Sequence, residues 1–332
     1  MEIAPLEGGS VAIRTIDKAS QLLFPDMRRL GFGCGDLYSG AAHAQSVRLI
    51  ETALEAGIRY FDVARMYGNG SAEAVLGSVL PRIRDRVIIV SKAGILPWSM
   101  LHWPQFLSRA TKAVRLAGPI ARALVPARPP TGPRFGAFRR TDLVRSVHRS
   151  LKDLRTDYLD ILLLHECSVA DSRDPEVVSF LEQLRAQGKI RAFGIATHFP
   201  ETCQILNETP GVAPVAQFAS DAFNRNVGAL PPGRAELVVT HTPIKQVLPR
   251  LLEHLAADRA AAARWTQRTG FAPDDRSGIA RLLLADAVAG NTAGIVLFSS
   301  SRPERITAAV AEDPGREALA ALHDELARIR GH

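Results

Sequence analysis

One pattern recurs along most of the chain: a short apolar run followed by a segment with helical spacing. Such runs are typical of buried parallel strands, and the amphipathic segments between them are typical of crossover helices. The eight runs occupy residues 29–33, 59–64, 87–91, 159–165, 190–196, 212–218, 237–240 and 294–298. Strands and helices in this alternation predict an α/β fold, a single closed (β/α)8 TIM barrel.

Signals for the start or end of a helix lie between the predicted strands. Segments with helical spacing cover residues 46–56, 141–154 and 175–187. Gly57 and Gly188 follow two of these segments, and glycine commonly ends a helix. Thr141 is a candidate N-cap for the segment at residues 141–154. Residues 10–16 alternate like one arm of an N-terminal hairpin, and we expect one domain over residues 1–332.

An open doubly wound sheet also alternates strands with helices. That fold normally carries the G-x-G-x-x-G sequence after its first strand, where it holds a dinucleotide pyrophosphate. Here residues 31–35 read GFGCG and lack the third glycine. The closed barrel is therefore the better interpretation.

Composition limits the class of protein. The chain has 332 residues, 46% of them hydrophobic and 23% charged, which is typical of a globular protein. No apolar run reaches the roughly 20 residues that cross a bilayer. A start containing Glu2 and Glu7 is not typical of a signal peptide. We expect a cytoplasmic protein without membrane contact.

The cysteines and the charge exclude further classes. Cys34, Cys167 and Cys203 lie far apart and lack the spacing of a zinc site, so we expect reduced cysteines and no metal. The formal net charge is +7, but the basic excess is concentrated in one loop and no nucleic-acid-binding motif is present. We therefore expect no nucleic-acid partner.

Four protonatable side chains lie at or near the ends of consecutive strands. Asp62, Lys92 and His165 end the second, third and fourth strands, and Tyr67 follows Asp62 by five residues. Each alone has an ordinary explanation as a cap, a rim residue or a packing residue. Because the carboxyl ends of all barrel strands open on one face, the four side chains are expected to converge there.

Together these groups fit the reduction of a carbonyl. Hydride delivery requires a proton donor for the developing alkoxide, and a tyrosine with a pKa of about 10 is a poor donor unless a cation favours its ionised form. Lys92 supplies that cation, and Asp62 holds the ammonium in place. His165 donates a hydrogen bond to the substrate oxygen and orients it.

At this point the chain resembles the aldo-keto reductase family, whose members carry an Asp, Tyr, Lys, His tetrad in this order. The resemblance rests on residues 56–62 (AGIRYFD), 157–160 (DYLD) and 188–195 (GKIRAFGI). It implies an NADPH-dependent reductase of a small aldehyde or ketone, or the reverse oxidation of an alcohol. It also implies that Tyr67 is the general acid, with Asp62, Lys92 and His165 in the roles given above.

The resemblance further implies a set of nicotinamide-cofactor contacts. They are Thr197, Gln217, His241, Thr242, Ser299, Ser300, Ser301, Arg302 and Arg305. Gln217 matches a glutamine that binds the carboxamide. Ala196 and Thr197 replace the usual Ser-Asn pair, and His241 replaces the aromatic ring that stacks on the nicotinamide.

Residues 299–305 resemble the segment that binds the adenosine 2′-phosphate. Hydroxyls and backbone N–H groups at a helix start suit an anion, and guanidinium groups suit a phosphate. A serine-capped helix explains the serines equally well, but it does not explain Arg302 and Arg305 beside a positive helix end. We therefore expect NADPH rather than NADH. Ala309 replaces a family asparagine near the adenine.

Residues 93–140 form an insertion that is too long for an ordinary βα loop. It contains no Asp or Glu, and in this family the corresponding loop overhangs the substrate. Trp98 and Trp103 are therefore candidate substrate contacts, and the arginines favour an acidic or bulky substrate. A solvated basic excursion, or a basic amphipathic helix at residues 106–124 for a partner or a membrane surface, explains the same composition.

Two other functions fit the same residues. One is a regulatory module that binds cofactor and turns over slowly, as some relatives bound to ion channels do. The other is a lyase that uses Lys92 as a Schiff-base nucleophile. The first leaves the intact Tyr67 and Lys92 unexplained, and the second leaves Asp62, Tyr67 and residues 299–305 without a role.

Overall fold

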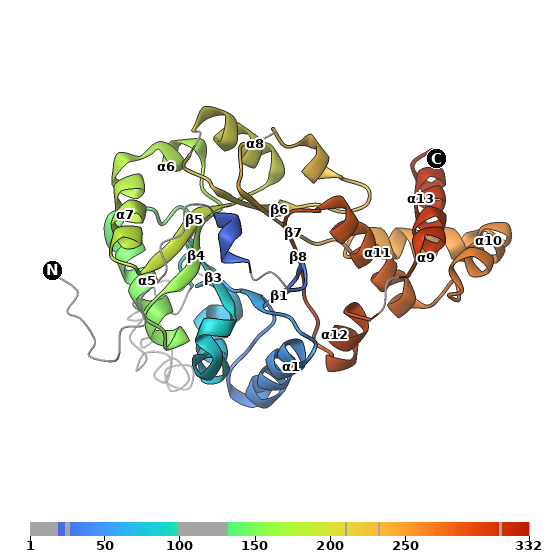
Figure 1. Ribbon diagram of the computed structural model, residues 1–332, viewed down its shortest axis with the longest axis horizontal. Helices are drawn as coiled ribbons and strands as arrows, with labels where there is room; N and C mark the ends of the chain where they lie inside the picture. Colours follow the sequence, from blue (N-terminus) through green and yellow to red (C-terminus); the bar gives the residue numbers. More distant parts are fainter. Residues whose placement is uncertain are drawn as a thin grey trace, which may run out of the picture.

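A closed barrel of eight parallel strands in sequence order forms the centre of the protein (Figure 1). The computed structural model describes residues 19–23, 27–97, 132–209, 211–231, 233–311 and 314–331. The strands are β1 (Leu30–Gly33), β2 (Tyr60–Asp62), β3 (Ile88–Ala93), β4 (Leu159–His165), β5 (Ile190–Ala196), β6 (Val215–Ala219), β7 (Leu237–His241) and β8 (Ile295–Phe298). β1 pairs with both β2 and β8, which closes the sheet and confirms the predicted TIM barrel.

The strand bounds follow the predicted ones closely, and β4 and β5 coincide with them. β6 begins three residues later than predicted, at Val215, directly after Pro214. Proline has no N–H to donate to a neighbouring strand, so it stands before the strand rather than within it. Its carbonyl accepts the N–H of Leu237, where β7 begins.

Helices surround the barrel. Those described are α1 (His43–Glu55), α2 (Ala72–Val79), α5 (Arg140–Leu154), α6 (Val169–Arg173), α7 (Pro175–Ala186), α8 (Phe199–Glu208), α9 (Val247–Ala257), α10 (Arg259–Thr269), α11 (Arg276–Gly290), α12 (Pro303–Ala309) and α13 (Arg316–Arg330). Gly57 and Gly188 follow α1 and α7 with φ of 82° and 66°, the left-handed backbone that glycine adopts without strain. Both glycine stops are thereby confirmed.

The predicted N-cap at Thr141 is wrong. α5 begins one residue earlier, at Arg140, and its N-cap is Arg139. The Arg139 carbonyl accepts the N–H groups of Asp142 and Leu143 at 2.9 and 3.0 Å. Because Thr141 already lies inside the first turn, its hydroxyl is not at the position from which a cap side chain bonds.

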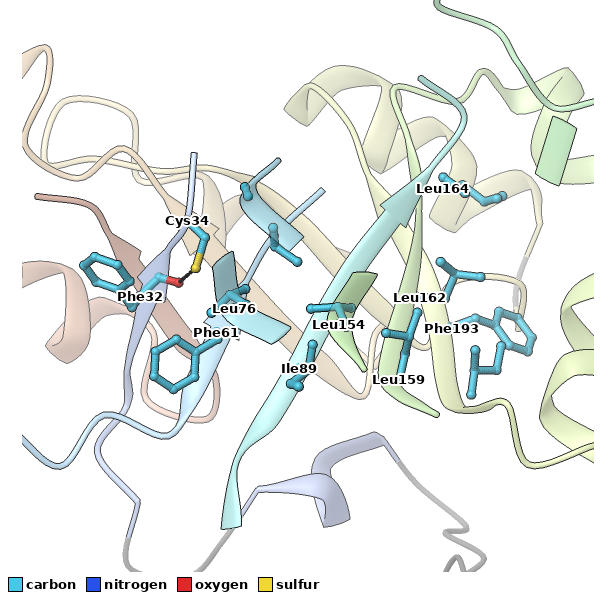
Figure 2. Close-up of a cluster of buried hydrophobic side chains, with 14 of the residues drawn as sticks. Phe32, Cys34, Phe61, Leu76, Ile89, Leu154, Leu159, Leu162, Leu164 and Phe193 are labelled. Carbon is cyan, nitrogen blue, oxygen red and sulfur yellow. Dashed lines mark hydrogen bonds between the residues drawn. The ribbon is translucent and has the colours of Figure 1, made fainter. Parts of the chain in front are cut away.

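Alternation along the strands separates two layers of core. Tyr60, Val90 and Leu163 belong to the cluster inside the barrel, which the 3-10 helix η1 (Ala19–Leu22) also joins. Phe61 and Leu162 belong to the larger cluster between the barrel and its helices (Figure 2). Successive side chains of a strand point to opposite faces, so this pattern fixes which residues face the barrel axis.

A second long excursion, which the sequence pattern did not predict, separates β7 from β8. Its three helices α9, α10 and α11 pack with α13 beside the barrel (Figure 1). They share a hydrophobic cluster of their own around the fully buried Trp265. The buried Glu325 of α13 binds His254 of α9 at 2.9 Å and Arg264 of α10 at 3.1 Å. This helical layer therefore has both apolar and ionic contacts.

The predicted insertion is described only at its two ends, where Leu96 pairs antiparallel with Arg134. The hairpin of residues 10–16 and the substrate contacts of Trp98 and Trp103 lie outside the described residues. None of the helices in the described ranges is long and apolar enough to span a membrane. The three cysteines are unpaired.

Candidate active site

The inward-facing side chains of the strands are apolar in the barrel core and polar at the mouth of the barrel. Five strands carry a polar residue on their inward-facing side at or near the carboxyl end. These residues are Asp62, Lys92, His165, Gln217 and His241, each two positions after a residue of the interior core. In a parallel barrel these positions lie at one face. All five line a cavity of about 870 Å³, as does Tyr67. The structure thus brings the four predicted catalytic side chains together.

Asp62 and Lys92 form a buried ion pair on neighbouring strands. Each is 2% exposed, and Lys92 Nζ lies 2.5 Å from Asp62 Oδ1. The ammonium also donates to the Val63 carbonyl at 3.2 Å. Burial lowers the pKa of Lys92, but Asp62 and Tyr67 more than offset this, so the pKa is raised above its usual value. The lysine is therefore a cation at neutral pH.

Tyr67 lies close to both Lys92 and His165. Lys92 Nζ is 5.0 Å from the centroid of the Tyr67 ring, and the His165 ring meets it edge-on at a centroid distance of 6.1 Å. Lys92 lowers the pKa of Tyr67, but burial and the charge of Asp62 together outweigh it, so the pKa is raised overall. The sequence predicted only the lowering influence. In the structure Tyr67 keeps its proton at neutral pH.

Two histidines at the mouth are neutral. Burial, followed by the charges of Lys92 and His241, lowers the pKa of His165 to about 3. Burial is also the main cause that lowers the pKa of His241 to about 4. A neutral imidazole carries one N–H donor and one acceptor. His165 is therefore able to donate a hydrogen bond without adding a charge beside Lys92.

The residues predicted to hold the nicotinamide lie beside this group. Thr197, Gln217, His241 and Thr242 all line the cavity. Gln217 is 3% exposed, and its Oε1 has no hydrogen-bond partner in the described part of the chain. Thr242 has φ of 60°, an uncommon backbone for a β-branched residue. An unpartnered buried acceptor fits a ligand that brings a donor, such as a carboxamide.

The predicted phosphate segment divides into two parts. Ser299, Ser300, Arg302 and Arg305 line the cavity, and Ser299 Oγ donates to the Gly33 carbonyl at 2.8 Å. Ser301 is not among the lining residues, and its carbonyl accepts Gln45 Nε2. Among the described residues no carboxylate pairs with the Arg302 or Arg305 guanidinium group. Both cations therefore remain available to an anion.

Sequence reasoning missed several cavity residues. Lys245, Arg276, Ser277 and Arg281 enter the cavity from the excursion between β7 and β8, and Glu166 enters it after β4. Glu166 has φ of 53°, a strained backbone directly after His165. The long gap between the last two predicted strands was a signal that this excursion is unusual. Nothing in its helical pattern indicated which of its side chains face the barrel.

Comparison with known proteins identifies related sequences. The model of the Aldo/keto reductase family matches residues 29–220. Methylglyoxal reductase YeaE of Escherichia coli is 29% identical over 182 residues, which cover 54% of this chain and 49% of that protein. A 6-dehydroglucose reductase of Agrobacterium fabrum is 32% identical over 174 residues, 52% of this chain and 49% of that one. The chain thus spans about half the length of the curated relatives it matches.

Solved structures share the fold over a longer stretch. Glycerol dehydrogenase AKR11B4 of Gluconobacter oxydans superposes with a TM-score of 0.64 at 20% identity and covers 92% of this chain and 93% of its own. An aldo-keto reductase of Klebsiella pneumoniae in complex with NADPH gives a TM-score of 0.58 at 22% identity, covering 92% and 90%. The whole barrel architecture is therefore common to these proteins.

Proposed function

Because the chain belongs to the aldo/keto reductase family, we propose that it is an NADPH-dependent oxidoreductase acting on a small aldehyde or ketone, or on the alcohol in reverse. The observation that carries this proposal is the convergence of Tyr67, Lys92 and His165 in one cavity of about 870 Å³. This volume is in the range of small-molecule and cofactor sites. We propose that the chain acts as one domain.

The cavity residues fit a nicotinamide cofactor, which when bound supplies or accepts the hydride. The unpartnered Oε1 of Gln217 would accept a hydrogen bond from the carboxamide, and the His241 ring would offer a stacking surface. Gly33 leaves room beside Ser299, since a Cβ there would lie 2.5 Å from the serine Oγ. Arg302 and Arg305 would bind the 2′-phosphate.

The proton comes from the chain itself. Tyr67 holds a proton on its hydroxyl and passes it to the substrate oxygen as negative charge develops there. The Lys92 ammonium stabilises the phenolate left behind, and Asp62 keeps that ammonium in place. Neutral His165 donates a hydrogen bond that orients the oxygen. The raised pKa of Lys92 is the opposite of what a Schiff-base nucleophile needs, which argues against the lyase.

The pH profile of kcat/KM for reduction tests the neutral His165. Because the pKa of His165 is lowered to about 3, the imidazole stays neutral at every pH above that value. We expect no acid limb from this group between about pH 5 and pH 8, where an ordinary histidine titrates. The measurement is the initial rate of NADPH oxidation across that range. A break near the ordinary histidine pKa that disappears in His165→Gln would contradict the assignment.

Binding of the two nucleotides tests the cofactor proposal directly. We expect micromolar NADPH binding by fluorescence titration, weakened about tenfold or more in Arg302→Ala with Arg305→Ala, because two charge-assisted contacts to the 2′-phosphate are lost. NADH binding should not change.

A matched control replaces Arg250 and Arg316, which do not line the cavity, with alanine. If neither nucleotide binds the wild-type protein, the proposed function fails. If NADPH and NADH are affected equally, the assignment of the 2′-phosphate segment fails.

A further inference from the structure

A second ionic cluster lies behind the barrel wall, close to the proposed catalytic pair. Arg65 and Glu73 form an ion pair in which the side chains are 2% and 0% exposed. Arg65 Nη1 also binds Asp153 Oδ2 of α5 at 2.9 Å. Charges are rarely buried to this extent without a specific reason, because the desolvation cost is several kcal/mol for each ion. The proposed reaction leaves all three residues without a role.

The guanidinium group of Arg65 bridges the loop that carries Tyr67. Arg65 precedes Tyr67 by two residues, and its Nη2 donates to the carbonyl of Gly70, three residues after Tyr67. Between these points Gly68 and Asn69 have φ of 56° and 53°. Gly68 adopts this backbone without strain, but for Asn69 it is uncommon and persists only where the surroundings fix it. Arg65 therefore closes the turn that presents Tyr67.

Glu73 connects this loop to the strand that carries Lys92. Its Oε1 accepts the Ser91 hydroxyl at 2.6 Å, while its other oxygen binds Arg65. Ser91 and Lys92 are neighbours in β3, so their side chains point to opposite faces of the strand. One carboxylate thus ties the back of the Lys92 strand to the base of the Tyr67 loop.

We propose that Arg65, Glu73 and Ser91 form a positioning network that holds Tyr67 in register with Lys92 from outside the barrel. The inference rests on the proposed function, in which these two side chains act on one proton. None of the three is among the described residues that line the cavity, so the network touches neither substrate nor cofactor. Its effect is geometric, and a misplacement of about 1 Å costs up to roughly 100-fold in rate.

The test compares Arg65→Lys with Arg84→Lys. Lysine keeps a charge for Glu73 and Asp153, but one ammonium cannot reproduce the fork that also reaches the Gly70 carbonyl. Arg84 is a matched control, because it too is largely buried, binds the buried Asp160 at 2.8 Å and does not line the cavity. We expect kcat to fall about 10- to 100-fold in Arg65→Lys, with KM and the NADPH Kd unchanged. Arg84→Lys should leave kcat within about twofold.

A readout that needs no turnover keeps this inference separate from the proposed function. Ultraviolet titration of each variant, minus that of its Tyr67→Phe counterpart, gives the pKa of Tyr67 alone. Because Lys92 lowers that pKa, loss of register in Arg65→Lys should raise it, and Arg84→Lys should not. Ser91→Ala serves as a second, milder variant if Arg65→Lys does not fold. An unchanged Tyr67 pKa and kcat in the folded variant would overturn the network, whereas absence of turnover in wild type would overturn only the proposed function.

Discussion

Replacing Tyr67 with phenylalanine will lower kcat for carbonyl reduction by about 10²- to 10⁴-fold, the range that general acid catalysis supplies. The substitution removes the hydroxyl that we propose as the proton donor and keeps the ring that meets His165 edge-on. Steady-state NADPH oxidation measures the rate, and fluorescence titration measures the Kd of NADPH. Since the proposed cofactor contacts come from other parts of the barrel mouth, that Kd should not change.

Tyr38→Phe is the matched control for this experiment. Tyr38 is 49% exposed and does not line the cavity, so loss of its hydroxyl should leave kcat unchanged. The free energy of unfolding of both variants should lie within about 1 kcal/mol of the wild-type value, because neither substitution changes the packing of the ring. A Tyr67→Phe protein with more than a tenth of the wild-type kcat would mean that another group donates the proton, and the proposed role of Tyr67 would be abandoned.

The barrel and most of its mouth were predictable from the sequence because both depend on a local rule. Successive side chains of a strand point alternately into the barrel and toward the helices. The position of a polar residue in this alternation therefore decides on which side it lies. Tyr60 and Ile161 are interior core residues, so Asp62 and His165 follow them on the same face. The same count from Val90 puts Lys92 inside and Ser91 outside. Strand position alone therefore identified three of the four proposed catalytic residues.

Other parts of the site depend on contacts that no local pattern contains. Arg276 and Arg281 reach the cavity only because α11 packs against the barrel. Nothing in the sequence distinguishes Arg65 from a surface arginine, because its ion pairs with Glu73 and Asp153 appear only in the structure. The pKa of Tyr67 also depends on a balance, in which burial and the charge of Asp62 raise it and the charge of Lys92 lowers it. The direction of the shift therefore requires the positions of all three residues.

Variants of the Asp62–Lys92 pair should distinguish its contribution to folding from its contribution to catalysis. Lys92→Met leaves the Asp62 carboxylate 2% exposed without its ion-pair partner, and breaking a buried pair from one side typically costs about 3–5 kcal/mol. Burial already raises the pKa of Asp62, and loss of Lys92 raises it further. A carboxyl group whose pKa is higher in the folded than in the unfolded state destabilises the fold at pH values above the unfolded pKa. The loss of unfolding free energy in Lys92→Met should therefore shrink as the pH falls toward about 4. Urea unfolding at several pH values measures it.

The double variant Asp62→Asn with Lys92→Met removes both charges and should recover most of the lost stability, because no unpaired buried charge remains. It should not recover activity, since the cation that is proposed to stabilise the Tyr67 phenolate is absent. If the double variant regains the free energy of unfolding but not kcat, the buried pair serves the reaction and does not stabilise the fold. If the double variant is instead as unstable as the two single losses added together, Asp62 and Lys92 contribute to folding independently, and the ion pair at 2.5 Å is not the reason for their burial.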